Sequence, residues 1–151
     1  MRKSTYLSGP IVRTRKSQKK YNDYKKAAKP VDGCVFCDTN ELAHPIDRGS
    51  MWVVENRFAY DTWDGCRVTG HLMVIPKRHV YSTNQLADNE KLEYLALLSE
   101  YEDQGYSVYS RAMTSATRTV DHLHTHLIQL NPKPIKAMVY LTKPHIMLYK
   151  K

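Results

Sequence analysis

The chain has 151 residues, a length that suits one domain with a buried core and is short for two. No apolar run approaches the roughly 18 residues of a membrane span and no signal-peptide core opens the chain, so the expected compartment is the cytoplasm. Three cysteines fit a reducing compartment better than a disulfide scaffold.

The net charge of +8 lies in residues 1–30, which carry ten Lys or Arg and the single acid Asp23. Residues 31–151 carry thirteen basic and fourteen acidic side chains. This division predicts a basic, disordered or loosely attached extension over 1–30, followed by a folded domain over 31–151. The extension could contact nucleic acid, with Tyr6, Tyr21 and Tyr24 stacking on bases, or could be a solubilising or packing segment.

The folded domain opens with Cys34 and Cys37. Their spacing lets one turn of chain present two thiolates to a zinc ion, and the chain has histidines to complete a tetrahedral set. A redox pair and two buried small residues are the alternatives. The polar segment that follows, with Pro45 and Gly49, predicts a helical turn or a loop.

Two strands are predicted next, over 51–55 and 58–62, and the two residues between them indicate a β-hairpin. Residues 71–75 form a nearly continuous apolar strand that Pro76 stops.

One helix is predicted, with Asp88 as its N-cap and Gly105 at its end. Its apolar side chains recur at spacing three, at Leu92, Leu95, Leu98 and Tyr101.

Two further strands are predicted over 106–111 and 120–130, with a polar turn between them. The prolines after Asn131 leave room only for short edge strands, at 137–142 and 145–149. The order of strands, helix and strands predicts the α+β class with an antiparallel sheet.

Three histidines alternate with other residues in the strand at 120–130: His122, His124 and His126. Successive side chains of a strand point to opposite faces, so the three imidazoles share one face and Leu123 and Leu127 face the core. Imidazole can act near neutral pH as nucleophile, base, acid or metal ligand. The alternative is a fortuitous histidine-rich strand that binds stray metal.

Four motifs in order resemble the histidine triad (HIT) family of nucleotide hydrolases and transferases, over residues 33–130. The motifs are Cys34-Val-Phe-Cys37, Asn56-Arg-Phe-Ala-Tyr-Asp61, Gly70-His-Leu-Met-Val-Ile-Pro-Lys-Arg-His79 and Thr119-Val-Asp-His-Leu-His-Thr-His-Leu-Ile128. The resemblance implies a five-stranded antiparallel sheet with one main helix, a homodimer, and cleavage of a bond to the α-phosphorus of a nucleotide.

The resemblance also implies roles for single residues. His124 would be the nucleophile that forms a nucleotidyl-imidazole intermediate, and His126 would contact the phosphate or the leaving group. Thr119 would donate a hydrogen bond on the leaving-group side. Asp61 would accept hydrogen bonds from the ribose, and Phe58 would pack on the base, although a core role for Phe58 is the stronger alternative.

Zinc-bearing members of the family resemble this chain in four ligand positions: Cys34, Cys37, His79 and His122. These residues would hold a structural zinc that braces the strand carrying His124. Without zinc, His122 would instead orient His124 through hydrogen bonds. His71 is expected to be structural.

The chain departs from the family in the turn at 113–118, which lacks glycines and carries Arg118, an extra cation expected near the phosphates. The expected function is hydrolysis of adenosine nucleotides or dinucleoside polyphosphates through His124. Transfer of the nucleotidyl group to phosphate or a sugar phosphate is one alternative. A nucleic-acid-binding protein that uses the basic extension is another.

Overall fold

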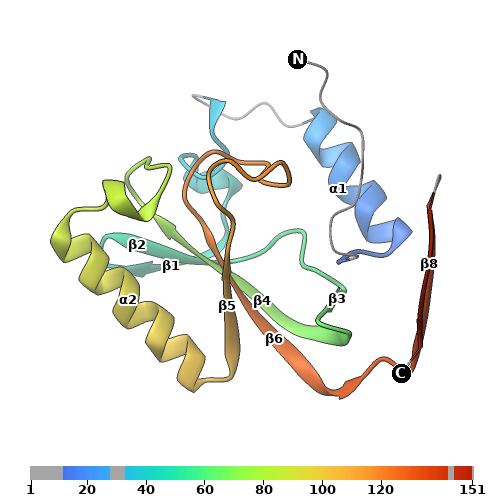
Figure 1. Ribbon diagram of the computed structural model, residues 1–151. Helices are drawn as coiled ribbons and strands as arrows, with labels where there is room; N and C mark the ends of the chain where they lie inside the picture. Colours follow the sequence, from blue (N-terminus) through green and yellow to red (C-terminus); the bar gives the residue numbers. More distant parts are fainter. Residues whose placement is uncertain (1–11, 28–32, 143–144, 151) are drawn as a thin grey trace.

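The computed structural model of the protein describes residues 12–27, 33–142 and 145–150 (Figure 1). Its centre is an antiparallel sheet with the strand order β1-β2-β4-β6-β5, to which the short strand β3 adds by pairing with β4. The strands of this sheet are β1 (Ala43–Arg48), β2 (Met51–Glu55), β3 (Thr62–Trp63), β4 (Cys66–Pro76), β5 (Tyr106–Ser110) and β6 (Thr125–Pro134). The predicted α+β class, with a five-stranded antiparallel path and one main helix, is confirmed.

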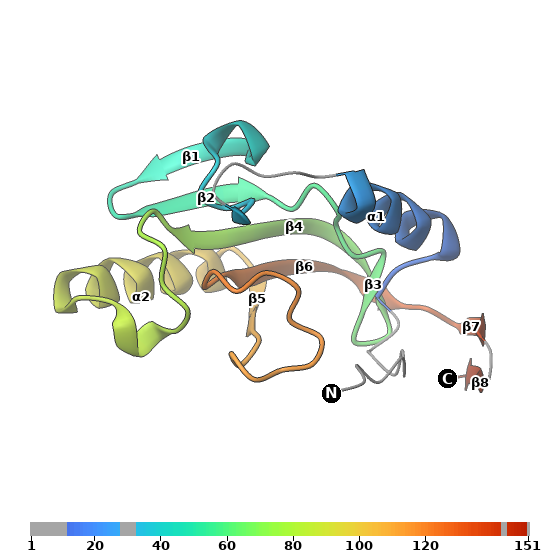
Figure 2. The same cartoon turned by 90° about the horizontal axis from the view of Figure 1, so that it is seen from above.

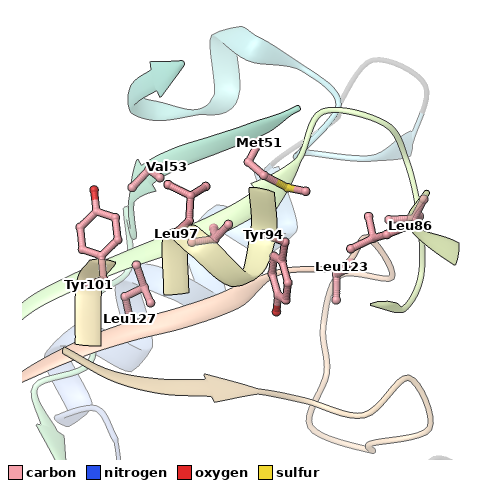
Figure 3. Packing of buried hydrophobic residues seen from close by; sticks show 10 residues of the cluster. Met51, Val53, Leu86, Tyr94, Leu97, Tyr101, Leu123 and Leu127 are labelled. Atoms are coloured by element: carbon pink, nitrogen blue, oxygen red, sulfur yellow. The ribbon is translucent and has the colours of Figure 1, made fainter. Parts of the chain in front are cut away.

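The main helix is α2 (Asp88–Asp103), and it covers one face of the sheet. Figure 3 shows Tyr94, Leu97 and Tyr101 of this helix beside Val53 and Leu127 of the sheet. The helix bounds agree with the sequence. Its N-cap is Ala87, whose amide donates to the Glu90 carboxylate, so the expectation of an Asp88 cap is wrong.

The apolar side chains that recur at spacing three in α2 are only partly buried. Leu92 and Leu95 are 71% and 60% exposed, whereas Tyr101 is buried and Leu98 packs against the core. A step of three residues falls about 60° short of a full helical turn, so side chains at strict spacing three spiral away from one face.

The hairpin at this end of the sheet differs from the predicted one. β1 and β2 pair with each other, and the left-handed Gly49 lies in the turn between them. Pro45 is accommodated because β1 is an edge strand and its register shifts between Ala43 and Ile46. Of the two forms expected for this polar segment, a helical turn is confirmed at Thr39–Glu41, which forms one turn of 3-10 helix. The strand β1 that follows was not predicted.

Residues 58–61 do not form the predicted strand. Their backbone amides donate elsewhere: Phe58 to the Asn56 side chain, Tyr60 to His71 Nδ1, and Asp61 to the Val12 carbonyl. A segment whose donors are used in this way cannot form a ladder with β2.

β6 begins three residues after His122, so only the last of the three triad histidines lies within the strand. The strand also extends past the predicted end at residue 130, through Pro132 to Pro134. The two short strands predicted after it are confirmed as β7 (Ala137–Thr142) and β8 (His145–Lys150), which pair with each other in a separate sheet.

The described part of the basic extension is a packed element. It forms α1 (Arg15–Ala27), which Figures 1 and 2 show near β3 and on the other side of the sheet from α2. Val12, just before it, is buried with Tyr60 and Ile128. Of the two forms expected for this segment, a loose arm or a packed extension, residues 12–27 have the second.

Within the described part of the chain, neither helix is both long and apolar enough to span a bilayer.

Candidate active site and metal centre

A cavity of about 300 Å³ lies on the face of the sheet opposite α2. His124 and His126 line it, together with side chains from α1, from the Cys34–Cys37 loop and from the turn before β6. Both histidines are more than 90% buried, and their ring centroids lie 5.2 Å apart in perpendicular planes. The alternation predicted from the sequence is therefore correct around them: Leu123 and Leu127 belong to the core under α2.

Cys34, Cys37, His79 and His122 come together beside this cavity. Their four ligand atoms all lie within 4.8 Å of one another. Cys34 Sγ and Cys37 Sγ are each 3.6 Å from His122 Nδ1, and Cys37 Sγ is 3.2 Å from His79 Nδ1. A tetrahedral zinc site has sulfur–nitrogen edges of about 3.6 Å, so this group can hold a metal ion.

His122 is oriented for ligation by its second ring nitrogen. Its Nε2 donates to the Pro76 carbonyl at 2.9 Å, which leaves the Nδ1 lone pair directed at the two sulfur atoms. Burial is the main cause that lowers the pKa of His122 to about 4, so the imidazole is neutral at pH 7, the form that binds metals.

The metal group and the cavity are connected through the backbone and through one ring. His124 Nδ1 donates to the His122 carbonyl at 2.8 Å, so the Nε2 atom of His124 carries its lone pair. The Phe36 ring, between the two cysteines in sequence, lies 5.1 Å from the His124 ring. Burial lowers the pKa of His124, which keeps this imidazole neutral and nucleophilic at pH 7.

His126 has the opposite tautomer, which His71 imposes. The Tyr60 amide donates to His71 Nδ1 at 3.0 Å, so the proton of neutral His71 must be on Nε2. His71 Nε2 lies 3.0 Å from His126 Nδ1 and donates to it. The Asn56 amide nitrogen, 3.1 Å from His71 Nε2, offers only protons and cannot accept this one. His126 therefore has its own proton on Nε2.

Burial lowers the pKa of His71 to about 3, with the charge of Arg13 adding to the effect, and lowers the pKa of His126 well below its usual value. Both rings are neutral at pH 7, as this chain of hydrogen bonds requires. His71 thus positions His126 through a hydrogen bond, a role in keeping with the structural one expected for it. The sequence feature that could have indicated this role is the position of His71 within the Gly70–His79 motif.

Residues 64–133 match the family model of the HIT domain, and within them lie the triad histidines and His79. Over these residues the chain is similar to the HIT domain.

Two known proteins illustrate this HIT relationship. "Protein hit" of Bacillus subtilis (strain 168) is 27% identical over 106 residues, which cover 64% of this chain and 70% of that protein. The structure of a HIT family hydrolase from Clostridium thermocellum superposes with a TM-score of 0.50 at 20% identity, covering 70% of this chain and 98% of that one. The second comparison supports the HIT fold.

Thr119 and Phe58, predicted to contact the nucleotide, both line the cavity of the HIT domain. The Thr119 hydroxyl accepts a hydrogen bond from Tyr21 at 2.9 Å. Phe58 is half-buried and lies between the rings of Tyr21 and Tyr24, at 5.3 and 4.8 Å. The two tyrosines therefore pack against Phe58, Tyr21 edge-on and Tyr24 tilted, while Tyr6 lies outside the described residues.

Asp61 and Arg118 are placed differently from the expectation. Asp61 accepts hydrogen bonds from the Thr14 amide at 2.6 Å and the Ser17 hydroxyl at 3.1 Å, so it fixes the start of α1. Arg118 donates to the carbonyls of Tyr81, Val120 and Asp121, and it is not among the cavity-lining residues. The arginines that do line the cavity are Arg13, Arg57 and Arg111, and of these Arg57 forms an ion pair with Glu41.

Proposed function

We propose that the protein is a nucleotide hydrolase or nucleotidyltransferase that cleaves a bond to the α-phosphorus through a covalent intermediate on His124. The observation that carries the proposal is the opposite protonation of two neighbouring imidazoles. His124 has a lone pair on Nε2 and His126 has a proton there, and both side chains line one cavity. A nucleophile and a donor side by side are what displacement at phosphorus needs.

The reaction has two balanced steps. The lone pair of His124 Nε2 forms a bond to phosphorus while the bond from phosphorus to the leaving group breaks. His126 Nε2 donates a hydrogen bond to the leaving atom, which departs with the electron pair of the broken bond and takes a proton from solvent. Water then bonds to phosphorus, the phosphorus–nitrogen bond breaks to restore the lone pair of His124, and the water releases a proton to solvent. An acceptor other than water would make the same site a transferase.

The substrate class follows from the cavity wall. Phe58 and Thr119 are the proposed nucleoside and leaving-group contacts, because both line the cavity with the two histidines. Because Asp61 is engaged by α1, a role in binding the ribose would require Thr14 and Ser17 to release it. Adenosine nucleotides are the proposed substrates, and the likeness to a protein described as a HIT family hydrolase supports hydrolysis.

Zinc is the proposed metal for Cys34, Cys37, His79 and His122, since two thiolates and two imidazoles within 4.8 Å suit its tetrahedral preference. Protein ligands would occupy all four coordination positions of such an ion. Its role would be structural, because it would hold the Cys34–Cys37 loop, including Phe36, against His124. A homodimer is proposed as well, on the family resemblance alone.

Contact with nucleic acid is a weaker candidate. Lys16, Lys19 and Lys20 of α1 are exposed, which favours electrostatic contact with a polyanion. Tyr21 and Tyr24, however, already pack on Phe58 and are not free to stack on bases.

The deciding experiment follows nucleotide release by chromatography from adenosine phosphoramidate, diadenosine tetraphosphate and adenylated DNA. We expect the wild type to turn over at least one of them and His124→Ala to be slower by at least about 10³-fold, since a lost nucleophile removes the two-step route. His44→Ala, at an exposed histidine of β1, is the matched control. Equal rates for wild type and His124→Ala would refute the mechanism.

A further inference from the structure

We propose that Arg13, from the N-terminal extension, and Arg111 form an anion subsite for at least one phosphate beyond the phosphate that His124 attacks. The substrate would then contain a phosphoanhydride, with its additional phosphate held between α1 and the HIT domain. This inference rests on the proposed function for the identity of the reacting phosphate. It goes further by assigning a substrate class and a role to the extension.

Arg13 is fixed in the cavity wall by direct contacts with uncharged groups. Its Nε and Nη2 donate to the Phe58 carbonyl at 3.2 and 2.7 Å. Its guanidinium carbon lies 4.7 Å from the centroid of the Tyr21 ring and 4.8 Å from that of Tyr60. Two rings and a carbonyl orient the cation, but none of them supplies a negative charge.

Arg111 contacts the same tyrosine, Tyr60. Its Nη2 donates to the Tyr60 hydroxyl at 3.2 Å, and its Nη1 donates to Thr117. The Tyr60 ring, over which Arg13 lies, is 5.4 Å from the ring of His126. Both guanidinium groups therefore contact the tyrosine that lies beside the hydrogen-bond donor of the proposed reaction centre.

Several other arginines are either paired with a carboxylate or, like Arg118, bonded to backbone carbonyls outside the cavity lining. Arg48, Arg57 and Arg78 each form an ion pair with a glutamate. Within the described ranges, Arg13 and Arg111 form no ion pair with a carboxylate. Asp61 is the acid whose charge acts on Arg13, but it gives its oxygens to Thr14 and Ser17.

Two half-buried like charges that have no ion-paired carboxylate are costly to desolvate, and a bound anion offsets that cost. Burial is the main cause that lowers the pKa of Arg13; the charge of Arg111 lowers it further, whereas Tyr60, Tyr21 and Asp61 raise it. Guanidinium groups bind phosphate oxygens through short, charge-assisted hydrogen bonds. A polyphosphate extending from His126 toward Tyr60 is the ligand that this arrangement fits.

The test separates binding from catalysis. In a His124→Ala background, the dissociation constants of AMP, ADP and inorganic tripolyphosphate are measured by calorimetry for the parent, Arg13→Gln and Arg111→Gln. We expect each change to weaken ADP binding by at least about tenfold more than AMP binding, the effect of losing one charge-assisted contact. Lys19→Gln, which removes an exposed charge from the same helix, controls for net charge.

The outcomes distinguish the two proposals. Equal losses for AMP and ADP, or equal losses for Lys19→Gln, would overturn the anion subsite whatever the enzyme does. ADP binding that depends on both arginines, in a protein whose wild type turns over nothing, would support the subsite and sink the proposed function. Because Arg13→Gln can also undock α1, Arg111→Gln provides the same test from within the HIT domain. Comparing turnover of diadenosine tetraphosphate with that of adenylated DNA shows which phosphoanhydride is used.

Discussion

The two faces of the sheet are built from the same strands but bury different kinds of side chain. Under α2, side chains such as Val53, Val74 and Leu127 are fully buried and almost wholly apolar. On the opposite face the buried side chains include His71 and the triad. Because neighbouring residues of β6 point to opposite faces, one strand supplies Leu127 to the core and His126 to the cavity.

The histidine face carries buried polar groups without leaving them unpaired. In the described part of the chain, every buried side-chain nitrogen and oxygen has a hydrogen-bond partner. Each histidine has a fixed tautomer because its neighbour takes or gives one proton. The apolar face therefore stabilises the fold through the apolar surface area that it buries. The histidine face instead sets the chemistry of the site through the direction of each hydrogen bond.

The largest change in stability is expected from removing a metal ligand beside the histidine face. We expect Cys37→Ser to lose bound metal and to lower the free energy of unfolding by about 4 kcal/mol at saturating metal, since a ligand that binds only the folded state stabilises it. Metal content and thermal unfolding measure both effects. Cys66→Ser, at a half-exposed cysteine of β4, is the matched control. Equal metal content in the two variants would contradict the assigned ligand set.

The next effect belongs to the apolar face. Leu127→Ala should lower the free energy of unfolding by about 3 kcal/mol, because it opens a cavity among Val53, Val74 and Leu97. Urea unfolding measures the loss. Leu92→Ala makes the same change at a side chain that is 71% exposed, and it should cost less than about 1 kcal/mol. Similar losses for both variants would mean that α2 packs differently.

A third change tests the donor on the cavity side of β6. His126→Ala should reduce kcat/KM by about 100-fold, the usual effect of losing one donor to the developing charge, while the stability changes less than in Leu127→Ala. Steady-state rates on the preferred substrate provide the measurement. Unchanged rates would show that His126 does not donate to the reacting group.

The smallest expected effect is a dependence of stability on pH. The pKa of His71 is about 3 in the folded protein and about 6.5 in the unfolded chain, so only the unfolded state binds this proton between those values. Stability is therefore full above pH 6.5 and falls as the pH decreases, by about 2 kcal/mol at pH 5. Urea unfolding at pH 7 and pH 5 should show a smaller difference in His71→Gln than in wild type. A difference of the same size in both proteins would contradict the assignment to His71.

Much of the site could be predicted because its residues are coded locally. Alternation in a strand separates His124 and His126 from Leu123 and Leu127 without reference to the rest of the chain. The spacing of Cys34 and Cys37 likewise indicates a pair of metal ligands, although a redox pair has the same spacing. The helix from Asp88 to Asp103 was also predictable, but not which of its leucines are buried, since that depends on where the sheet lies.

By itself, the sequence determined the α+β class through the order of its predicted strands and helix. It also determined the triad and the four candidate metal ligands, because these residues lie in short motifs that can be identified along the chain. Only the tertiary structure decided which arginine reaches the cavity and which proton each imidazole holds. Arg118 is the cation nearest the triad along the chain, yet its guanidinium group binds backbone carbonyls and does not line the cavity. Arg13, from a distant segment of the chain, lies in the cavity wall instead. Such choices depend on contacts between residues far apart in sequence, and no local pattern encodes those contacts.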